Sequence, residues 1–132
     1  MKVASTNGVK VEMYDMGGTG PNMLLSHANG FHGRCWKPVA DNLIKRFHCY
    51  SFDHRGHGDT RAPKDWKVAW AGYGADATAC AKSINEPGGI IGVGHSMGGA
   101  TLLIAAIKNP GLFRGLLLYE PIVKPDDVRM PA

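Results

Sequence analysis

Short apolar runs that alternate with helix-length segments constrain this chain most strongly. Four such runs follow the first twenty residues, at positions 21–28, 47–53, 88–94 and 114–120. Between them lie three segments with the length and apolar spacing of helices, at 36–46, 70–84 and 97–109. This alternation predicts an α/β fold with a mostly parallel sheet and helices on both faces. Functional sites in such open sheets lie beyond the carboxyl ends of the strands.

The first sixteen residues predict a β-hairpin instead. Two strand-like segments, 2–6 and 9–16, flank Asn7-Gly8, and this dipeptide between alternating runs is a strong hairpin signal. The sheet should therefore have about six strands. Residues 124–132 carry two prolines and two aspartates and are expected to form a loop.

Composition narrows the class of protein. The chain has 132 residues, of which 44% are hydrophobic, so it holds enough apolar material for one domain with a core. Its net charge of +4 is scattered without a long basic run, which argues against a nucleic-acid partner. No apolar stretch is long enough to cross a bilayer, so no membrane span is expected.

The cysteines give a clue to the compartment. Cys35, Cys49 and Cys80 are odd in number and form no Cys-x-x-Cys pair. This pattern disfavours a zinc site and a disulfide framework. It is typical of reduced thiols in a cytoplasmic protein, and the start of the chain has no apolar leader.

The sequence "GVGHSMGG" at 92–99 predicts a nucleophilic serine. An apolar strand leads into Gly94-x-Ser96-x-Gly98 and an apolar-periodic helix follows it. In such a turn the serine has a strained backbone, often with positive φ, and its hydroxyl stands clear of the sheet. The backbone N–H of Met97 would then donate to an oxyanion. The alternative is that Ser96 only caps the helix.

Three motifs together carry a resemblance to a known family. The sequences "SHANGFHG" at 26–33, "FDHRGHGDT" at 52–60 and "GVGHSMGG" at 92–99 resemble the α/β-hydrolase superfamily, in particular its esterase and lipase-like members. The resemblance implies that residues 1–132 form the N-terminal portion of an α/β-hydrolase fold, a truncated core without the cap and the last strands. It also implies a small ester-like substrate and no cofactor or metal.

The family resemblance places a second oxyanion donor on the loop after residue 26. Here the chain departs from the usual His-Gly pattern, because His27 is followed by Ala-Asn-Gly. If Gly30 takes the role of the family's glycine, the donor is the Phe31 N–H. The alternative donor is Asn29, and a loop that merely reverses the chain is a further possibility.

The resemblance also implies the order serine, then carboxylate, then histidine. All six histidines lie on or before the serine turn, so the catalytic base is expected outside this chain, with His27 or His32 as weaker candidates. Glu120, at the end of the last predicted strand, is the candidate carboxylate. The alternative is a glutamate at a strand end without a catalytic duty.

The predicted function is a serine hydrolase that acts on an ester, thioester or amide, with little turnover in this fragment. Alternatives are a non-catalytic or partner-completed protein, or an acyltransferase or haloperoxidase-like enzyme that uses the same serine. Asp53 and Arg55 are expected to lock loops by charge-assisted hydrogen bonds. A metal site built from Asp53, His54 and His57 is the disfavoured alternative. The aromatic residues Trp36, Trp66, Trp70 and Tyr73 are expected to pack in the core or between helices rather than line a pocket.

Overall fold

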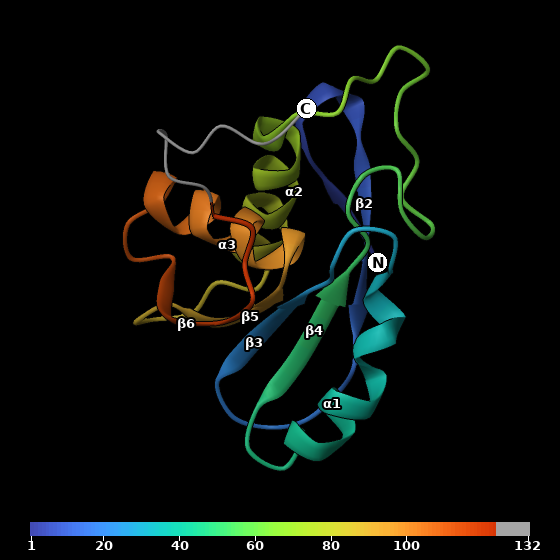
Figure 1. Ribbon diagram of the computed structural model, residues 1–132. Helices are drawn as coiled ribbons and strands as arrows, with labels where there is room; N and C mark the ends of the chain where they lie inside the picture. The colour runs from blue at the N-terminus through green and yellow to red at the C-terminus, as the bar shows by residue number, and fades with distance from the viewer. Residues whose placement is uncertain (124–132) are drawn as a thin grey trace.

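One sheet of six strands organises the chain (Figure 1). The computed structural model describes residues 1–123, so the expected loop at 124–132 lies outside the described residues. The strand order is β1-β2-β4-β3-β5-β6. The strands are β1 (Lys2–Ala4), β2 (Lys10–Asp15), β3 (Asn22–Ser26), β4 (His48–Phe52), β5 (Ile90–His95) and β6 (Phe113–Tyr119). The helices are α1 (Lys37–Leu43), α2 (Trp70–Ser83) and α3 (Met97–Lys108), with short 3₁₀ turns η1 (Thr6–Gly8) and η2 (Gly33–Trp36).

The pairing confirms both the hairpin and the parallel sheet. Strands β1 and β2 pair antiparallel around Asn7, whose φ of 58° is the left-handed conformation that tight hairpin turns use. Strand β2 then runs antiparallel to β4, and the four strands β4, β3, β5 and β6 are parallel to one another. Their carboxyl ends therefore meet at one edge of the sheet.

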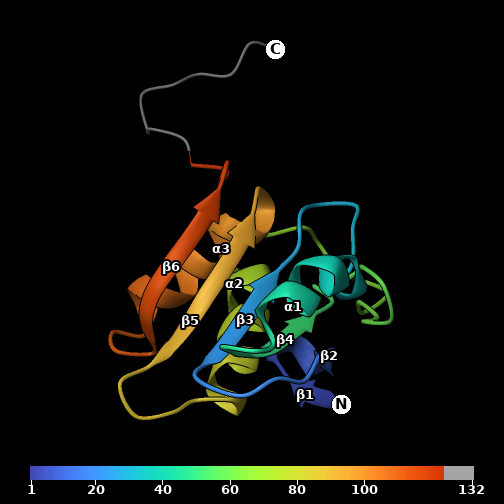
Figure 2. The ribbon, with the colours of Figure 1, turned by 90° about the horizontal axis from the view of Figure 1, so that it is seen from below.

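Helices cover both faces, as Figure 2 shows, with α1 on one side and α2 and α3 on the other. Each side has its own apolar cluster. On the α2 and α3 side, Met13, Leu24, Phe52 and Leu102 are fully buried. The α1 cluster is smaller and is built around Met23, Leu25, Ala40 and Cys49. The predicted helix at 36–46 is shorter than expected, because α1 ends at Leu43 and its first turn is the 3₁₀ turn η2.

Strand β6 forms one end of the sheet. Its only strand neighbour among residues 1–123 is β5, and Leu117 and Tyr119 are each 61% exposed. Within the described residues, β6 therefore presents an exposed, partly apolar strand edge. None of the helices within residues 1–123 is both long enough and apolar enough to span a membrane.

Candidate active site

The turn between β5 and α3 places Ser96 at the carboxyl edge of the sheet. Its backbone has φ 53° and ψ −115°, a conformation that non-glycine residues rarely adopt. Its amide donates to Tyr119 O at 3.0 Å and its carbonyl accepts from Ala100 N and Ile122 N, each at 3.2 Å. The Ser96 hydroxyl makes no capping hydrogen bond to α3. Ser96 thus occupies the N-cap position of α3 without a capping bond from its side chain, and the predicted positive φ is confirmed.

Gly94 and Gly98 are required by the close approach of other backbone atoms. A Cβ on Gly94 would lie 2.6 Å from the Cα of Gly99, and one on Gly98 would collide with the carbonyl oxygen of Ser26. The helix N-terminus thus packs directly against the end of β3. Met97, the first residue of α3, is 4% exposed, and its amide has no hydrogen-bond acceptor within residues 1–123.

The loop after β3 does not present its amides as expected. The Phe31 N–H donates to Ala28 O at 3.1 Å, within a turn in which Gly30 has φ 82°. That donor is therefore already used inside the loop. The amide of Asn29, the alternative, makes no such bond within the described part of the chain. Asn29 also lines the same pocket as Met97, whereas Phe31 lines a different one.

The Asn29 side chain is held by a histidine from the neighbouring loop. His57 Nε2 lies 3.1 Å from Asn29 Oδ1, and His57 Nδ1 lies 3.1 Å from Arg55 O. This contact joins the loop after β3 to the loop after β4. Sequence reasoning missed it, although both loops follow strands that pair in parallel register, with Ser26 opposite Phe52.

Neither His27 nor His32, the two weaker candidates for the base, makes a hydrogen bond to Ser96 within residues 1–123. His27 is 1% exposed, and its Nδ1 donates to Ala28 O at 2.7 Å while its Nε2 accepts from His54 N at 3.1 Å. Burial lowers the pKa of His27 to about 4, so the ring is neutral. His32 is exposed and lies 3.5 Å from Cys35 Sγ.

His54 belongs to a buried network that the sequence did not reveal. Its Nε2 lies 3.0 Å from Ser26 Oγ, which is 3.2 Å from Thr101 Oγ1, and Thr101 donates to Gly98 O at 2.9 Å. Burial lowers the pKa of His54 well below its usual value. The network links the end of β3, the β4 loop and the first turn of α3, the three segments that surround the site.

Asp53 and Arg55 have the structural roles that the sequence predicted. The Asp53 carboxylate accepts from Gly33 N at 2.7 Å and from the Tyr14 hydroxyl at 2.6 Å. Arg55 is 2% exposed and binds the fully buried carboxylate of Asp76 through Nε and a terminal nitrogen, at 3.0 and 2.8 Å. No group of three His, Cys, Asp or Glu side chains within residues 1–123 has the arrangement of a metal site.

Glu120 lies one step along the sheet from Ser96. The register pairs His95 with Tyr119, the last residues of β5 and β6. Ser96 and Glu120 are therefore the residues that directly follow these two strands. Glu120 is exposed and has a φ of 44°. The positive-φ residues other than glycine within 1–123 are Asn7, Ser96 and Glu120.

Trp70 is not a core residue, so the core interpretation is wrong for this side chain. Its ring is 46% exposed, at the start of α2, and it lines a pocket of about 280 Å³ beside Met97. Tyr73, one turn later, is 5% exposed and lines the same pocket. Aromatic residues are usually buried, but the first turn of a helix at the carboxyl edge of the sheet faces the site instead.

Comparison with known proteins places the chain in a family. A sequence model described as "Alpha/beta hydrolase family" matches residues 23–132. The monoglyceride lipase homolog of Monkeypox virus is 31% identical over 110 residues, which are 80% of this chain and 40% of that protein. The 2-(acetamidomethylene)succinate hydrolase of Mesorhizobium japonicum is 32% identical, over 78% of this chain and 36% of its own length.

Solved structures agree with the sequence match. The N-formylmaleamic acid deformylase of Pseudomonas putida S16 superimposes with a TM-score of 0.84 and 28% identity, over 100% of this chain and 51% of that one. The chain thus spans about half or less of the length of these proteins. The six strands and flanking helices correspond to the N-terminal half of their fold. The chain belongs to the alpha/beta hydrolase family.

Proposed function

We propose that this chain carries the nucleophile of a serine hydrolase that acts on an ester, thioester or amide. The observation that carries the proposal is the backbone of Ser96, which has φ 53° and ψ −115° between β5 and α3 and a hydroxyl that caps nothing. A strained residue persists only where its surroundings hold it, and such residues gather at functional sites. The hydrolases among the relatives support the reaction class.

In the proposed reaction, Ser96 Oγ attacks the carbonyl carbon of the substrate and its proton passes to a base. The carbonyl oxygen becomes an oxyanion, which accepts hydrogen bonds from the Met97 and Asn29 amides. We place the second donor at Asn29 rather than at Phe31, because the Phe31 amide already donates to Ala28 O. The bond between the carbonyl carbon and the leaving group then breaks, the leaving group takes the proton from the base, and an acyl ester remains on Ser96.

The second half of the cycle restores the enzyme. A water molecule gives a proton to the same base and attacks the acyl carbon. The bond to Ser96 Oγ then breaks, and the serine regains a proton. Glu120, at the end of the strand beside Ser96, is proposed as the carboxylate that orients the base.

The base itself is proposed to come from outside residues 1–123. Within those residues the Ser96 hydroxyl has no hydrogen-bond partner, and His27, His54 and His57 are all engaged elsewhere. We therefore expect residues 1–132 alone to have little or no turnover. We also propose that residues 1–132 form a truncated core of a single domain. A cytoplasmic location is proposed as well, and three unpaired cysteines support it.

The relatives leave the substrate open. The name of one relative contains a monoglyceride, which is an uncharged ester. The name of another contains a substituted succinate, which is charged. The relatives therefore support the reaction class, and the substrate has to be inferred from the shape and charge of the site.

A fluorophosphonate probe tests the proposal directly. The full-length gene product should take up one probe on the peptide that contains Ser96, and Ser96→Ala should take up none. Ser83→Ala is the matched control, because Ser83 is a hydroxyl at the far end of α2 that donates to Cys80 O. A folded protein that takes no probe would favour a non-catalytic or partner-completed protein on this fold.

A further inference from the structure

The pocket beside Met97 defines a substrate class, on the basis of the proposed function. It has a volume of about 280 Å³ and includes Asn29 and Met97, the two residues whose amides are proposed to hold the oxyanion. Because Ser96 directly precedes Met97, an acyl group on Ser96 with its carbonyl oxygen at these amides would lie beside this pocket. The other lining residues are Val68, Ala69, Trp70, Tyr73 and Ile122.

The walls of this pocket are apolar and partly aromatic. Trp70 and Tyr73 stand edge to face, with ring centroids 6.3 Å apart and planes at 64°. Burial, followed by the nearby Asp76 carboxylate, raises the pKa of Tyr73, so its hydroxyl stays protonated. Asn29 supplies the one side-chain amide in the lining, and that amide oxygen is already 3.1 Å from His57 Nε2.

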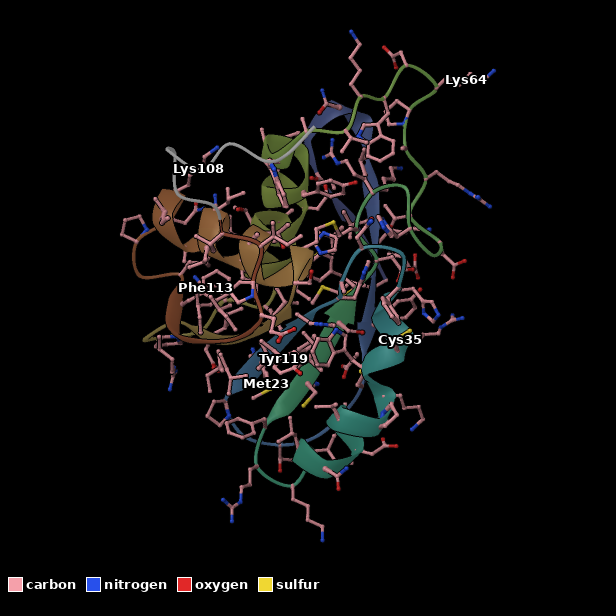
Figure 3. The ribbon with its side chains drawn as sticks, viewed as in Figure 1. Met23, Cys35, Lys64, Lys108, Phe113 and Tyr119 are labelled. Carbon is pink, nitrogen blue, oxygen red and sulfur yellow. The ribbon has the colours of Figure 1, made fainter. Side chains whose placement is uncertain are left out.

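No side chain that lines this pocket carries a charge. Lys64, Asp65 and Lys67, in the loop that leads into α2, lie outside this lining. Figure 3 shows Lys64 at the outer tip of that loop, directed away from the sheet. Asp65 and Lys67 line a separate cavity, together with Arg55, whose guanidinium is bound by Asp76. A carboxylate placed in the pocket beside Met97 would lose its hydration, and the lining offers no lysine or arginine to replace it.

We propose that this pocket takes the acyl group of the substrate, and that this acyl group is uncharged and apolar. The substrate class is therefore an ester, thioester or amide of a short aliphatic or aryl-substituted acid. A volume of about 280 Å³ holds roughly nine groups of the size of a water molecule. Val68 stands at the outer edge, 74% exposed, and Trp70 forms a wall that an alkyl or aryl group contacts.

A matched pair of esters tests the charge preference. The 4-methylpentanoyl and succinyl esters of p-nitrophenol have acyl groups of nearly equal size and shape, and only the succinyl group carries a charge. The full-length gene product should hydrolyse the uncharged ester with a kcat/KM at least about a hundredfold higher. Equal rates, or a preference for the succinyl ester, would overturn the inference.

A charge introduced into the pocket tests the location. In Val68→Lys the ammonium group is placed at the pocket, and Val68→Met is a control of similar length without charge. Because Val68 is 74% exposed, neither change removes core packing. The lysine should shift the ratio of the two kcat/KM values at least tenfold toward the succinyl ester, and the methionine should not. An unchanged ratio in Val68→Lys would show that the acyl group lies elsewhere.

Probe labelling separates this inference from the proposed function. If Ser96 takes the fluorophosphonate and the esters are cleaved without the expected preference, the pocket assignment alone fails. If Ser96 takes no probe and neither ester is cleaved, the serine hydrolase proposal fails and the pocket assignment fails with it.

Discussion

Ser96 and Glu120 follow directly opposed residues of two neighbouring strands. His95 pairs with Tyr119 in the register of β5 and β6, and the Ser96 amide donates to Tyr119 O at 3.0 Å. Both residues have positive φ, 53° and 44°. A serine and a glutamate, each with a strained backbone and each at the end of a strand, form the centre of the proposed site.

Replacement of Glu120 by glutamine tests its proposed role. The variant keeps the size of the side chain and removes the charge that would orient and stabilise a protonated base. The full-length gene product should lose about a hundredfold or more in kcat/KM with an unchanged unfolding midpoint. Asp41→Asn is the control, because Asp41 is an exposed carboxylate on α1 paired only with Lys37. A loss of less than about threefold in Glu120→Gln would leave Glu120 without a catalytic role.

His57 is expected to act through Asn29. His57→Ala removes the 3.1 Å contact to Asn29 Oδ1 and frees the loop that carries the second oxyanion donor. Because an oxyanion donor acts mainly in the transition state, kcat should fall about tenfold while KM changes little.

His48→Ala is the matched control for His57→Ala. His48 also has an imidazole bound to a side chain, Asp15 at 2.7 Å, but it lies at the opposite end of β4. Equal losses in both variants, or a rise in KM without a fall in kcat, would contradict the positioning role of His57.

A methyl group at Gly98 should destabilise the turn between β5 and α3. Its Cβ would collide with the backbone carbonyl of Ser26 and lie 2.6 Å from His27 O, and neither atom moves without shifting β3. Gly98→Ala should lower the free energy of unfolding by about 3 kcal/mol in urea titrations. Gly115→Ala is the control, because a Cβ there meets nothing within 4 Å. Similar stabilities of the two variants would show that the turn between β5 and α3 does not need this close approach.

Acid should destabilise the fold through His27. Burial holds its pKa at about 4 in the folded chain, against about 6.5 in an unfolded one. As the pH falls below about 6.5 the unfolded state binds a proton first, so the stability falls until about pH 4 and then levels off. The loss attributable to His27 is about 3 kcal/mol, and the lowered pKa of His54 acts in the same direction.

Urea titrations between pH 7 and pH 4, with NMR titration of the imidazoles, measure this effect. His32→Gln is the matched control, because it removes an exposed imidazole from the same loop. A His27 ring that titrates near 6.5 in the folded protein would contradict the account.

The sequence predicted the features that depend on local pattern. Periodicity located the strands and helices because buried strands and amphipathic helices leave distinct spacings. The backbone strain at Ser96 followed from the glycines at 94 and 98, which allow a close approach that other residues prevent.

The features that sequence reasoning missed depend on tertiary contacts. Arg55 and Asp76 are 21 residues apart and meet only because α2 packs beneath the loop after β4. The choice between Phe31 and Asn29 as donor depends on one turn, in which the Phe31 amide bonds back to Ala28. Trp70 is exposed because of its place at the carboxyl edge, which average burial preferences do not report.

Trapping the acyl intermediate shows whether Ser96 is the nucleophile. The full-length gene product is mixed with p-nitrophenyl acetate, quenched in acid within the first turnover, and mapped by peptide mass spectrometry. The account predicts one acetyl group on Ser96, a matching burst of p-nitrophenol, and neither in Ser96→Ala. Steady turnover that continues in Ser96→Ala, or an acetyl group found only on another residue, would contradict it.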